Sequence, residues 1–221
     1  MTSLCSVVPF EDHISRLSIV FDRLRKANLK LKSTKYNLFQ TKVKFLGSVV
    51  SGEGIEPDPA KAEAVASWPR PLNVTEVRGF VALASYYRRH IEHFAEIARP
   101  LHELTRKNVS FHWGERQEES FQELKRRLTS APLLSMPVEG EPFVLDTDAS
   151  NHALGVVLQR WQDGVLRVIG YASRVLNLAE TRYCTTRKEL TGIMFGLKYY
   201  RHFLVGKHFE LRTDHAALTY L

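Results

Sequence analysis

The chain has 221 residues, 44% of them hydrophobic, which is enough to bury one large core or two smaller ones. Its formal net charge of +7, from 31 Lys and Arg against 24 Asp and Glu, favours a polyanionic partner over a merely basic surface. The two cysteines lack metal-site spacing and no apolar run approaches ~18 residues, which excludes a disulfide framework, a cysteine zinc site and a transmembrane helix. We expect a soluble chain of a reducing compartment such as the cytoplasm, with no membrane partner.

The first third of the chain predicts a helix, a hairpin and a second helix. Residues 11–28 repeat apolar side chains at helical spacing, which indicates an amphipathic helix. Residues 43–57 predict a β-hairpin, whose turn is the glycine-rich run 51–54. A short helix is expected to begin near Pro59 and to end before Pro69.

Residues 57–130 predict a helical unit with no evident catalytic chemistry. Its longest helix is capped by Asn73 or Thr75 and contains Gly79. Glycine costs about 1 kcal/mol relative to alanine inside a helix, which favours close approach of another helix or of a nucleic-acid backbone there. Two further helical patterns follow, around residues 97–104 and 115–128.

The run Tyr86–His90 joins aromatic rings to the cations Arg88 and Arg89. This mixture stacks on bases or sugars and neutralises phosphates in nucleic-acid-binding proteins. Tyrosines in the core with arginines in water are an equally good interpretation.

The pattern then changes to strands. Residues 143–148, 152–161 and 165–172 predict an antiparallel meander. A helix over residues 186–203 then makes a right-handed crossover to a strand at 208–213, which lies parallel to the first strand. The expected fold class is α+β or α/β, with a helical unit followed by a mixed sheet and its crossover helix.

Three acidic residues of this last part are candidate metal ligands. Asp148 ends the first strand, Glu189 lies in the first turn of the crossover helix, and Asp214 follows the last strand. We expect the two strand ends to be neighbours and the helix to bring its glutamate to them. Carboxylates gathered in this way hold hard divalent cations through oxygen ligands.

Each of these residues also has an interpretation that needs no metal. Thr186 and Glu189 fit a capping box, Asp214 fits a helix N-cap, and Asp148 fits a turn residue. Asp146 is a rival ligand because it shares the strand face of Asp148.

Ordered blocks over nearly the whole chain resemble the Pol polyprotein of gypsy-class long-terminal-repeat retrotransposons. They are KFLGSVVSGEGIEPDPAKAEAVASWPRPLNVTEVRGFVALASYYRRHIEHFAEIARPLHELT, FHWGERQEESFQELKRRLTSAPLL, VLDTDAS, TTRKEL and RTDHAAL. The resemblance implies the end of a reverse-transcriptase palm at residues 1–56, a thumb and connection at 57–139, and a ribonuclease H domain at 140–221. It also implies a primer-grip hairpin at Phe45, Leu46 and Gly47, and a thumb helix along the template–primer duplex that carries Gly79, Leu83 and Tyr86.

The resemblance further implies two-metal hydrolysis of the RNA strand of an RNA–DNA hybrid, with Mg²⁺ as cofactor and Mn²⁺ as a substitute. Asp148 would bridge both ions, and Glu189 and Asp214 would help to hold the ion on the leaving group. The remainder of the Pol polyprotein is an expected partner, and virus-like particles or the nucleus are further expected locations.

Two family features are absent from these 221 residues: the paired aspartates of the polymerase and the fourth ribonuclease H carboxylate. We therefore expect no DNA synthesis and weak or absent cleavage by the isolated chain. The alternatives are a non-catalytic nucleic-acid-binding fragment and a protein-interaction remnant.

Overall fold

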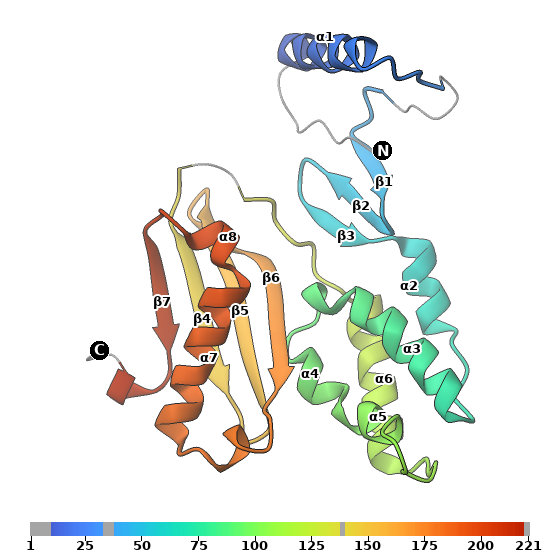
Figure 1. Cartoon of the computed structure of the whole chain (residues 1–221), viewed down its shortest axis with the longest axis vertical. Coiled ribbons are helices and arrows are strands. Elements are labelled where there is room, and N and C mark those ends of the chain that lie inside the picture. Colours follow the sequence, from blue (N-terminus) through green and yellow to red (C-terminus); the bar gives the residue numbers. More distant parts are fainter. Residues whose placement is uncertain (1–9, 33–37, 138–139, 219–221) are drawn as a thin grey trace. The chain divides into compact units, whose positions relative to one another are not determined.

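The computed structural model describes residues 10–32, 38–137 and 140–218, which form two compact units (Figure 1). The first unit, Met1–Val43, contains α1 (Phe10–Lys26), and no residue of this helix is buried. The helix predicted over residues 11–28 is confirmed, although no apolar face of it is buried against the described residues. The second unit, Lys44–Leu221, contains the remaining helices and the sheets described below, except the first two residues of β1. Among the described helices, none is both long and apolar enough to cross a membrane.

A three-stranded sheet in the order β1-β2-β3 is built from β1 (Lys42–Phe45), β2 (Ser48–Ser51) and β3 (Ile55–Pro57). Strands β2 and β3 pair antiparallel around the predicted 51–54 turn, so the expected hairpin is confirmed. A second turn joins β1 to β2 through Leu46 and Gly47, at the position where the resemblance implies a hairpin.

The helical part follows in chain order, and two predicted helix starts are confirmed by their caps. The Asp58 carboxylate accepts from the Ala60 amide. Asn73, rather than Thr75, accepts from the Glu76 amide at 2.9 Å. The elements are α2 (Pro59–Ala66), α3 (Val74–Tyr86), the 3₁₀ turn η2 (Arg88–His90), α4 (Phe94–Ile97), α5 (Arg99–Leu104) and α6 (Glu115–Thr129).

The helices enclose one hydrophobic core.

The helical pattern predicted around residues 97–104 is split, because α4 ends at Ile97 and Pro100 lies in the first turn of α5. Proline has no amide hydrogen to continue a helix but suits the start of a new one. The fully buried core residues include Val77, Phe80, Ala84, Leu101, Phe121 and Leu124.

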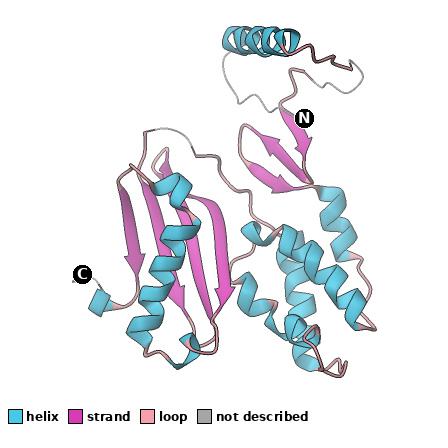
Figure 2. Ribbon diagram, viewed as in Figure 1, coloured by secondary structure: helices cyan, strands magenta, loops and turns pink. Residues whose placement is uncertain are grey.

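The second sheet has the order β6-β5-β4-β7 and confirms the predicted meander and crossover (Figure 2). Strands β4, β5 and β6 pair antiparallel, and β7 pairs parallel with β4. Helix α7 covers one face of the sheet. The elements are β4 (Phe143–Ala149), β5 (Ala153–Gln162), β6 (Val165–Val175), η3 (Glu180–Arg182), α7 (Thr185–Tyr199), α8 (Arg201–Leu204), β7 (Phe209–Thr213) and η4 (Ala216–Leu218).

The helical part and this sheet meet at Ser173 on β6. The Ser173 hydroxyl accepts from the buried Ala95 amide at 2.9 Å, and its carbonyl accepts from the Arg88 guanidinium. Arg88 also lies over the Phe94 ring. Arg88 is therefore half-buried and engaged within the fold, whereas Arg89 is exposed.

Candidate metal centre

Asp148, Glu189 and Asp214 converge at the carboxyl ends of β4 and β7. One oxygen from each carboxylate lies within 4.8 Å of the others. The parallel register pairs Thr147 with Thr213, so the next residue of each strand reaches the same edge of the sheet. Helix α7 then brings Glu189, its fifth residue, to that edge, rather than from the first turn as predicted.

Glu189 is 3% exposed, whereas the two aspartates are exposed. Its burial, together with the neighbouring Asp214 and Asp148, raises the pKa of its carboxyl to about 7. Its Oε2 atom is buried and has no hydrogen-bond partner among the described residues. A buried carboxylate in this position calls for a proton or a cation. Three hard oxygen donors around an orphaned oxygen fit Mg²⁺ or Mn²⁺.

For Glu189 and Asp148, the structure does not support the interpretations that need no metal. The N-cap of α7 is Cys184, so Thr186 lies inside the helix and the predicted capping box is wrong. The Thr186 hydroxyl instead pairs with His215 Nε2 at 2.8 Å. In the β4–β5 turn, Ser150 accepts from the amides of His152 and Ala153. The turn-forming role expected of Asp148 therefore belongs to Ser150.

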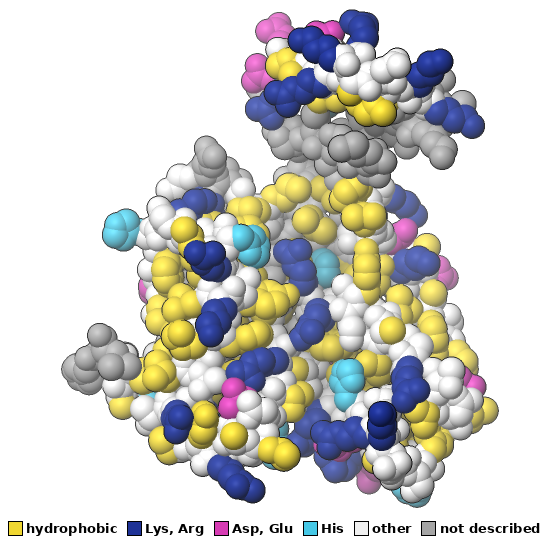
Figure 3. Space-filling model, in the orientation of Figure 1, with side chains coloured by type: hydrophobic (Ala, Val, Ile, Leu, Met, Phe, Trp, Pro, Cys, Tyr) yellow, Lys and Arg dark blue, Asp and Glu magenta, His cyan; other side chains and the backbone are white. Residues whose placement is uncertain are grey.

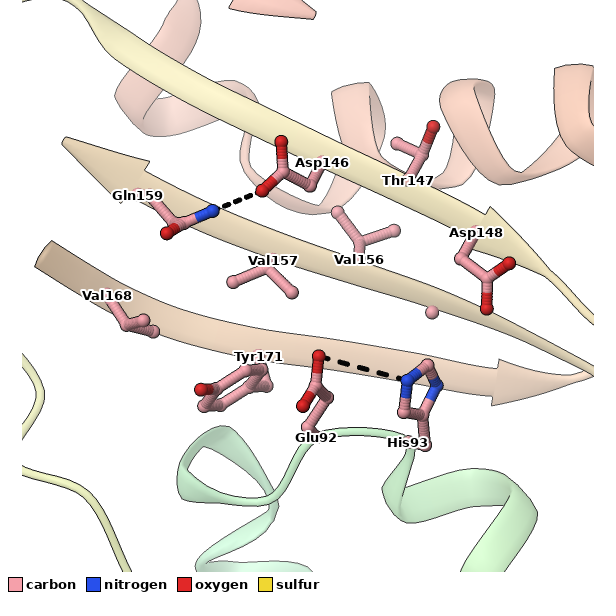
Figure 4. A pocket seen from close by; sticks show the side chains of 11 residues that line it. Glu92, His93, Asp146, Thr147, Asp148, Val156, Val157, Gln159, Val168 and Tyr171 are labelled. Carbon is pink, nitrogen blue, oxygen red and sulfur yellow. Dashed lines mark hydrogen bonds and ion pairs between the residues drawn. The ribbon is translucent and has the colours of Figure 1, made fainter. Parts of the chain in front are cut away.

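Asp146, the rival ligand, lies outside the three-carboxylate cluster found in the described part of the chain. Its carboxylate accepts from the Gln159 amide, and burial raises its pKa (Figure 4). Asp146 is thus tied to β5 while Asp148 points to the cluster.

A cavity of about 300 Å³ lies beside Asp148, and sequence reasoning missed part of its lining. Glu92 and His93 enter it from the helical part, as Figure 4 shows. A side chain on Gly155, the cross-strand partner of Asp148, would approach His93 Nδ1 to 3.0 Å. No periodic or motif signal marks these two residues, because only the tertiary fold brings their segment to the sheet.

The predicted nucleic-acid-binding residues lie on β1, on the turn after it, along α3 and in η2. Tyr86 and the turn meet, because the Tyr86 hydroxyl donates to the Leu46 carbonyl. Gly79 is exposed, and an added Cβ would contact only Trp68, at 3.9 Å. Among the described residues, no helix therefore packs closely against this glycine. Leu83 is partly buried against the helical core.

Comparison with known proteins identifies the family. A model of the RNase H-like domain found in reverse transcriptase matches residues 113–211. The Pol polyprotein of transposon 412 from Drosophila melanogaster is 38% identical over 208 residues, which is 94% of this chain and 17% of the relative. That of transposon gypsy from the same species is 36% identical over 222 residues, 95% of this chain and 21% of the relative.

The chain belongs to the Pol polyproteins of gypsy-type retrotransposons. This Pol region spans the end of a reverse transcriptase and an RNase H-like domain. It covers about a fifth of the length of the curated relatives that it matches. The foamy viral protease-reverse transcriptase dRH in complex with double-stranded DNA has a TM-score of 0.81 at 21% identity, over 98% of the Pol region and 39% of that chain. The foamy viral protease-reverse transcriptase in complex with RNA/DNA hybrid has a TM-score of 0.79 at 22% identity, over 93% and 28%. These likenesses confirm the mixed α+β fold.

Proposed function

We propose that this Pol region binds an RNA–DNA hybrid or template–primer duplex and hydrolyses the RNA strand at Asp148, Glu189 and Asp214. The observation that carries the proposal is the convergence of these three carboxylates, and the orphaned oxygen of Glu189 adds to it. Divalent cations bound there would supply an activated water and would stabilise the leaving 3′ oxygen. We also propose the palm, thumb and ribonuclease H boundaries of 1–56, 57–139 and 140–221.

The chain's own residues keep the carboxylates in place. The Thr186–His215 hydrogen bond ties the first turn of α7 to the segment just after β7, which holds Glu189 near Asp214. Lys188, which is 7% exposed, donates to Asn151 Oδ1 at 3.0 Å and so ties the same helical turn to the β4–β5 turn. Both bonds limit motion of the ligand-bearing segments and pre-organise the site.

The proposed partner is a nucleic-acid duplex because two solved neighbours are complexes with double-stranded DNA and with RNA/DNA hybrid. Basic side chains outnumber acidic ones on the face shown in Figure 3. Along α7 and α8, Arg187, Lys198 and Arg201 are exposed. These cations also favour the second candidate function, duplex binding without cleavage.

The test is cleavage of a labelled RNA–DNA hybrid with Mn²⁺ by the whole chain, by Asp148→Asn and by Asp163→Asn. The last is a matched control, because Asp163 is exposed in the β5–β6 turn. Where the chain cuts, we expect it and Asp163→Asn to cut the RNA strand equally weakly and Asp148→Asn to leave it intact. Equal cutting by all three would disprove the site. Salt-sensitive binding without cutting would support the second candidate function.

A further inference from the structure

The end of the sheet that carries Asp148 is a row of three residues paired across the strands. Asp148 on β4 pairs with Gly155 on β5, and Gly155 pairs with Ser173 on β6. The Ser173 hydroxyl accepts from the Ala95 amide of α4, so this row reaches the junction with the helical part. Asp148 is therefore connected to the helical part through two cross-strand pairs.

The start of α4 lies against the same row. His93, which precedes α4, has a left-handed backbone with φ of 54°. Figure 4 shows its ring at the same end of the sheet as Asp148. A Cβ on Gly155 would lie 3.0 Å from His93 Nδ1, so glycine leaves the room that this ring occupies. Helix α4 and the residue before it thus contact the second and third members of the row.

The turn that follows Asp148 is organised by the Ser150 hydroxyl. This oxygen accepts from the amides of His152 and Ala153, at 3.2 and 3.0 Å. Both of its acceptor positions are then used, and its own proton remains to be donated. The acceptors within reach are the Glu96 carboxylate at 3.2 Å and the Ala153 carbonyl at 3.3 Å. The carboxylate is the charged acceptor and forms the stronger bond.

Glu96 reaches this turn from the helical part. An acidic residue in the first turn of a helix also interacts favourably with the helix dipole, but α4 has only four residues and the Glu96 side chain extends to Ser150. The neighbouring turn residue, Asn151, is held by Lys188 of α7. The turn is therefore held from two sides, by the helical part and by the helix that carries Glu189.

We propose that Glu96 is a positioning residue of the metal centre: its carboxylate holds the Ser150 hydroxyl and so fixes the strand end that carries Asp148. A ligand that is already ordered loses less conformational freedom when a cation binds, which raises the affinity for the cation. The helical part then influences cation binding although it supplies none of the three carboxylates. This inference rests on the metal centre proposed above but not on cleavage.

Four variants test the proposal. Glu96→Ala removes the acceptor, whereas Glu96→Gln removes the charge and keeps a carbonyl oxygen that can accept the same proton. Ser150→Ala is made alone and together with Glu96→Ala. Glu119→Ala is the matched control, because Glu119 is exposed on α6 and its loss removes one negative charge from the helical part.

Mn²⁺ affinity is measured by titration calorimetry for each whole chain, and amide hydrogen exchange of residues 149–153 is measured in EDTA. We expect Glu96→Ala to bind Mn²⁺ about fivefold more weakly and to exchange faster in the turn, without a comparable fall in thermal stability. Glu96→Gln should keep most of the affinity. Glu96→Ala should cause no further loss in the Ser150→Ala background, and Glu119→Ala should bind as the unaltered chain does.

Unchanged Mn²⁺ affinity or unchanged exchange in Glu96→Ala would overturn the inference. Equal losses in Glu96→Ala and Glu96→Gln would assign the effect to charge, and a further loss in the double variant would show that Glu96 does not act through Ser150. Either result also overturns it.

Failure of the proposed function gives different results. A chain that binds Mn²⁺ through Asp148 but cuts no RNA loses the hydrolysis and keeps this inference. A chain whose Mn²⁺ affinity does not respond to Asp148→Asn loses the metal centre, and this inference is overturned with it. Loss of affinity in Asp148→Asn but not in Glu96→Ala overturns this inference alone.

Discussion

Glu189 shows how position decides the chemistry of a single residue. A glutamate near the start of a helix is ordinarily exposed and ionised, yet this one is 3% exposed and lies beside two other carboxylates. Both effects disfavour its charged form, and burial is the larger. Its carboxyl is therefore partly protonated at neutral pH in the absence of metal, and a cation would displace the proton.

This shift predicts how the stability of the metal-free chain depends on pH. The Glu189 pKa is raised from 4.5 to about 7 in the folded state, so between these values the folded chain binds more protons than the unfolded chain. Its contribution is fully present below pH 4.5 and is lost as the pH rises through about 7, on the order of 1–3 kcal/mol. Thermal unfolding in EDTA from pH 4.5 to 8 measures this. Glu189→Gln should flatten the profile, and an identical slope in both proteins would contradict the prediction.

Asp148 predicts a separable effect on metal binding. Asp148→Asn keeps the shape of an exposed side chain but removes one anionic ligand, so the fold should remain while Mn²⁺ affinity falls about tenfold or more. Titration calorimetry measures the affinity, and circular dichroism checks the fold. Unchanged Mn²⁺ affinity would mean that another residue holds the ion, and Asp163→Asn again serves as the control.

At the scale of elements, two helices contain glycines for different reasons. Gly196 lies where α7 crosses the sheet, and a Cβ there would meet Val156 at 3.0 Å and Leu145 at 3.3 Å. Both neighbours belong to the buried core beneath the helix, so neither moves easily. Gly79 on α3 has open space, with Trp68 at 3.9 Å.

The two glycines therefore predict opposite outcomes for the same substitution. Gly196→Ala should destabilise the chain by about 1–2 kcal/mol, because overpacking exceeds the gain in helix propensity. Gly79→Ala should stabilise it by up to about 1 kcal/mol, because only the propensity changes. Chemical unfolding measures both. If Gly79→Ala also weakens hybrid binding, close approach of a nucleic-acid backbone to α3 is supported. A stabilising Gly196→Ala would show that α7 shifts to make room.

For the second compact unit as a whole, the junction at Ser173 joins the helical part to the sheet. Its hydroxyl is the acceptor of the Ala95 amide in a buried setting. The same junction carries Glu92 and His93 to the cavity beside Asp148. The helical part thus completes the surroundings of a site whose candidate ligands all belong to the sheet and its crossover helix.

Ser173→Ala is expected to destabilise the chain by about 1–3 kcal/mol, because the Ala95 amide is left buried without its acceptor. Urea unfolding measures the change. Ser130→Ala is the control, since Ser130 is exposed and its hydroxyl donates only to the end of its own helix. Equal stability of the two variants would indicate that the Ala95 amide finds another partner.

The net charge of +7 predicts that hybrid binding depends strongly on salt. A duplex held through about four phosphates gives a slope near −4 for the logarithm of affinity against the logarithm of salt concentration. Fluorescence anisotropy at salt concentrations from about 50 to about 200 mM measures this slope. A slope near zero would contradict binding through the phosphate backbone.

Local patterns in the sequence were sufficient for most elements and for the three carboxylates. Period-two and helical patterns predicted β4, β5, β6 and α7, because side-chain periodicity directly reflects which face is buried. The parallel pairing of β7 with β4 was expected because a helix-containing connection is long enough to cross over between parallel strands. The break between α4 and α5 and the left-handed backbone of Leu46 were missed. The first depended on one proline, and the second on hydroxyls 40 residues away.

The amino-acid sequence by itself determined the class of fold, the family and the three acidic residues at the ends of their elements, since these depend on local spacing and on ordered motifs. Only the tertiary structure decided that Glu189 is buried, that Asp146 is tied to Gln159 and that His93 lies against Gly155. It also decided that Tyr86 and Tyr87 donate to the carbonyls of the β1–β2 turn. The physical reason is that burial, pKa and hydrogen-bond partners depend on contacts between segments that are distant in the sequence. Local periodicity carries no information about such contacts.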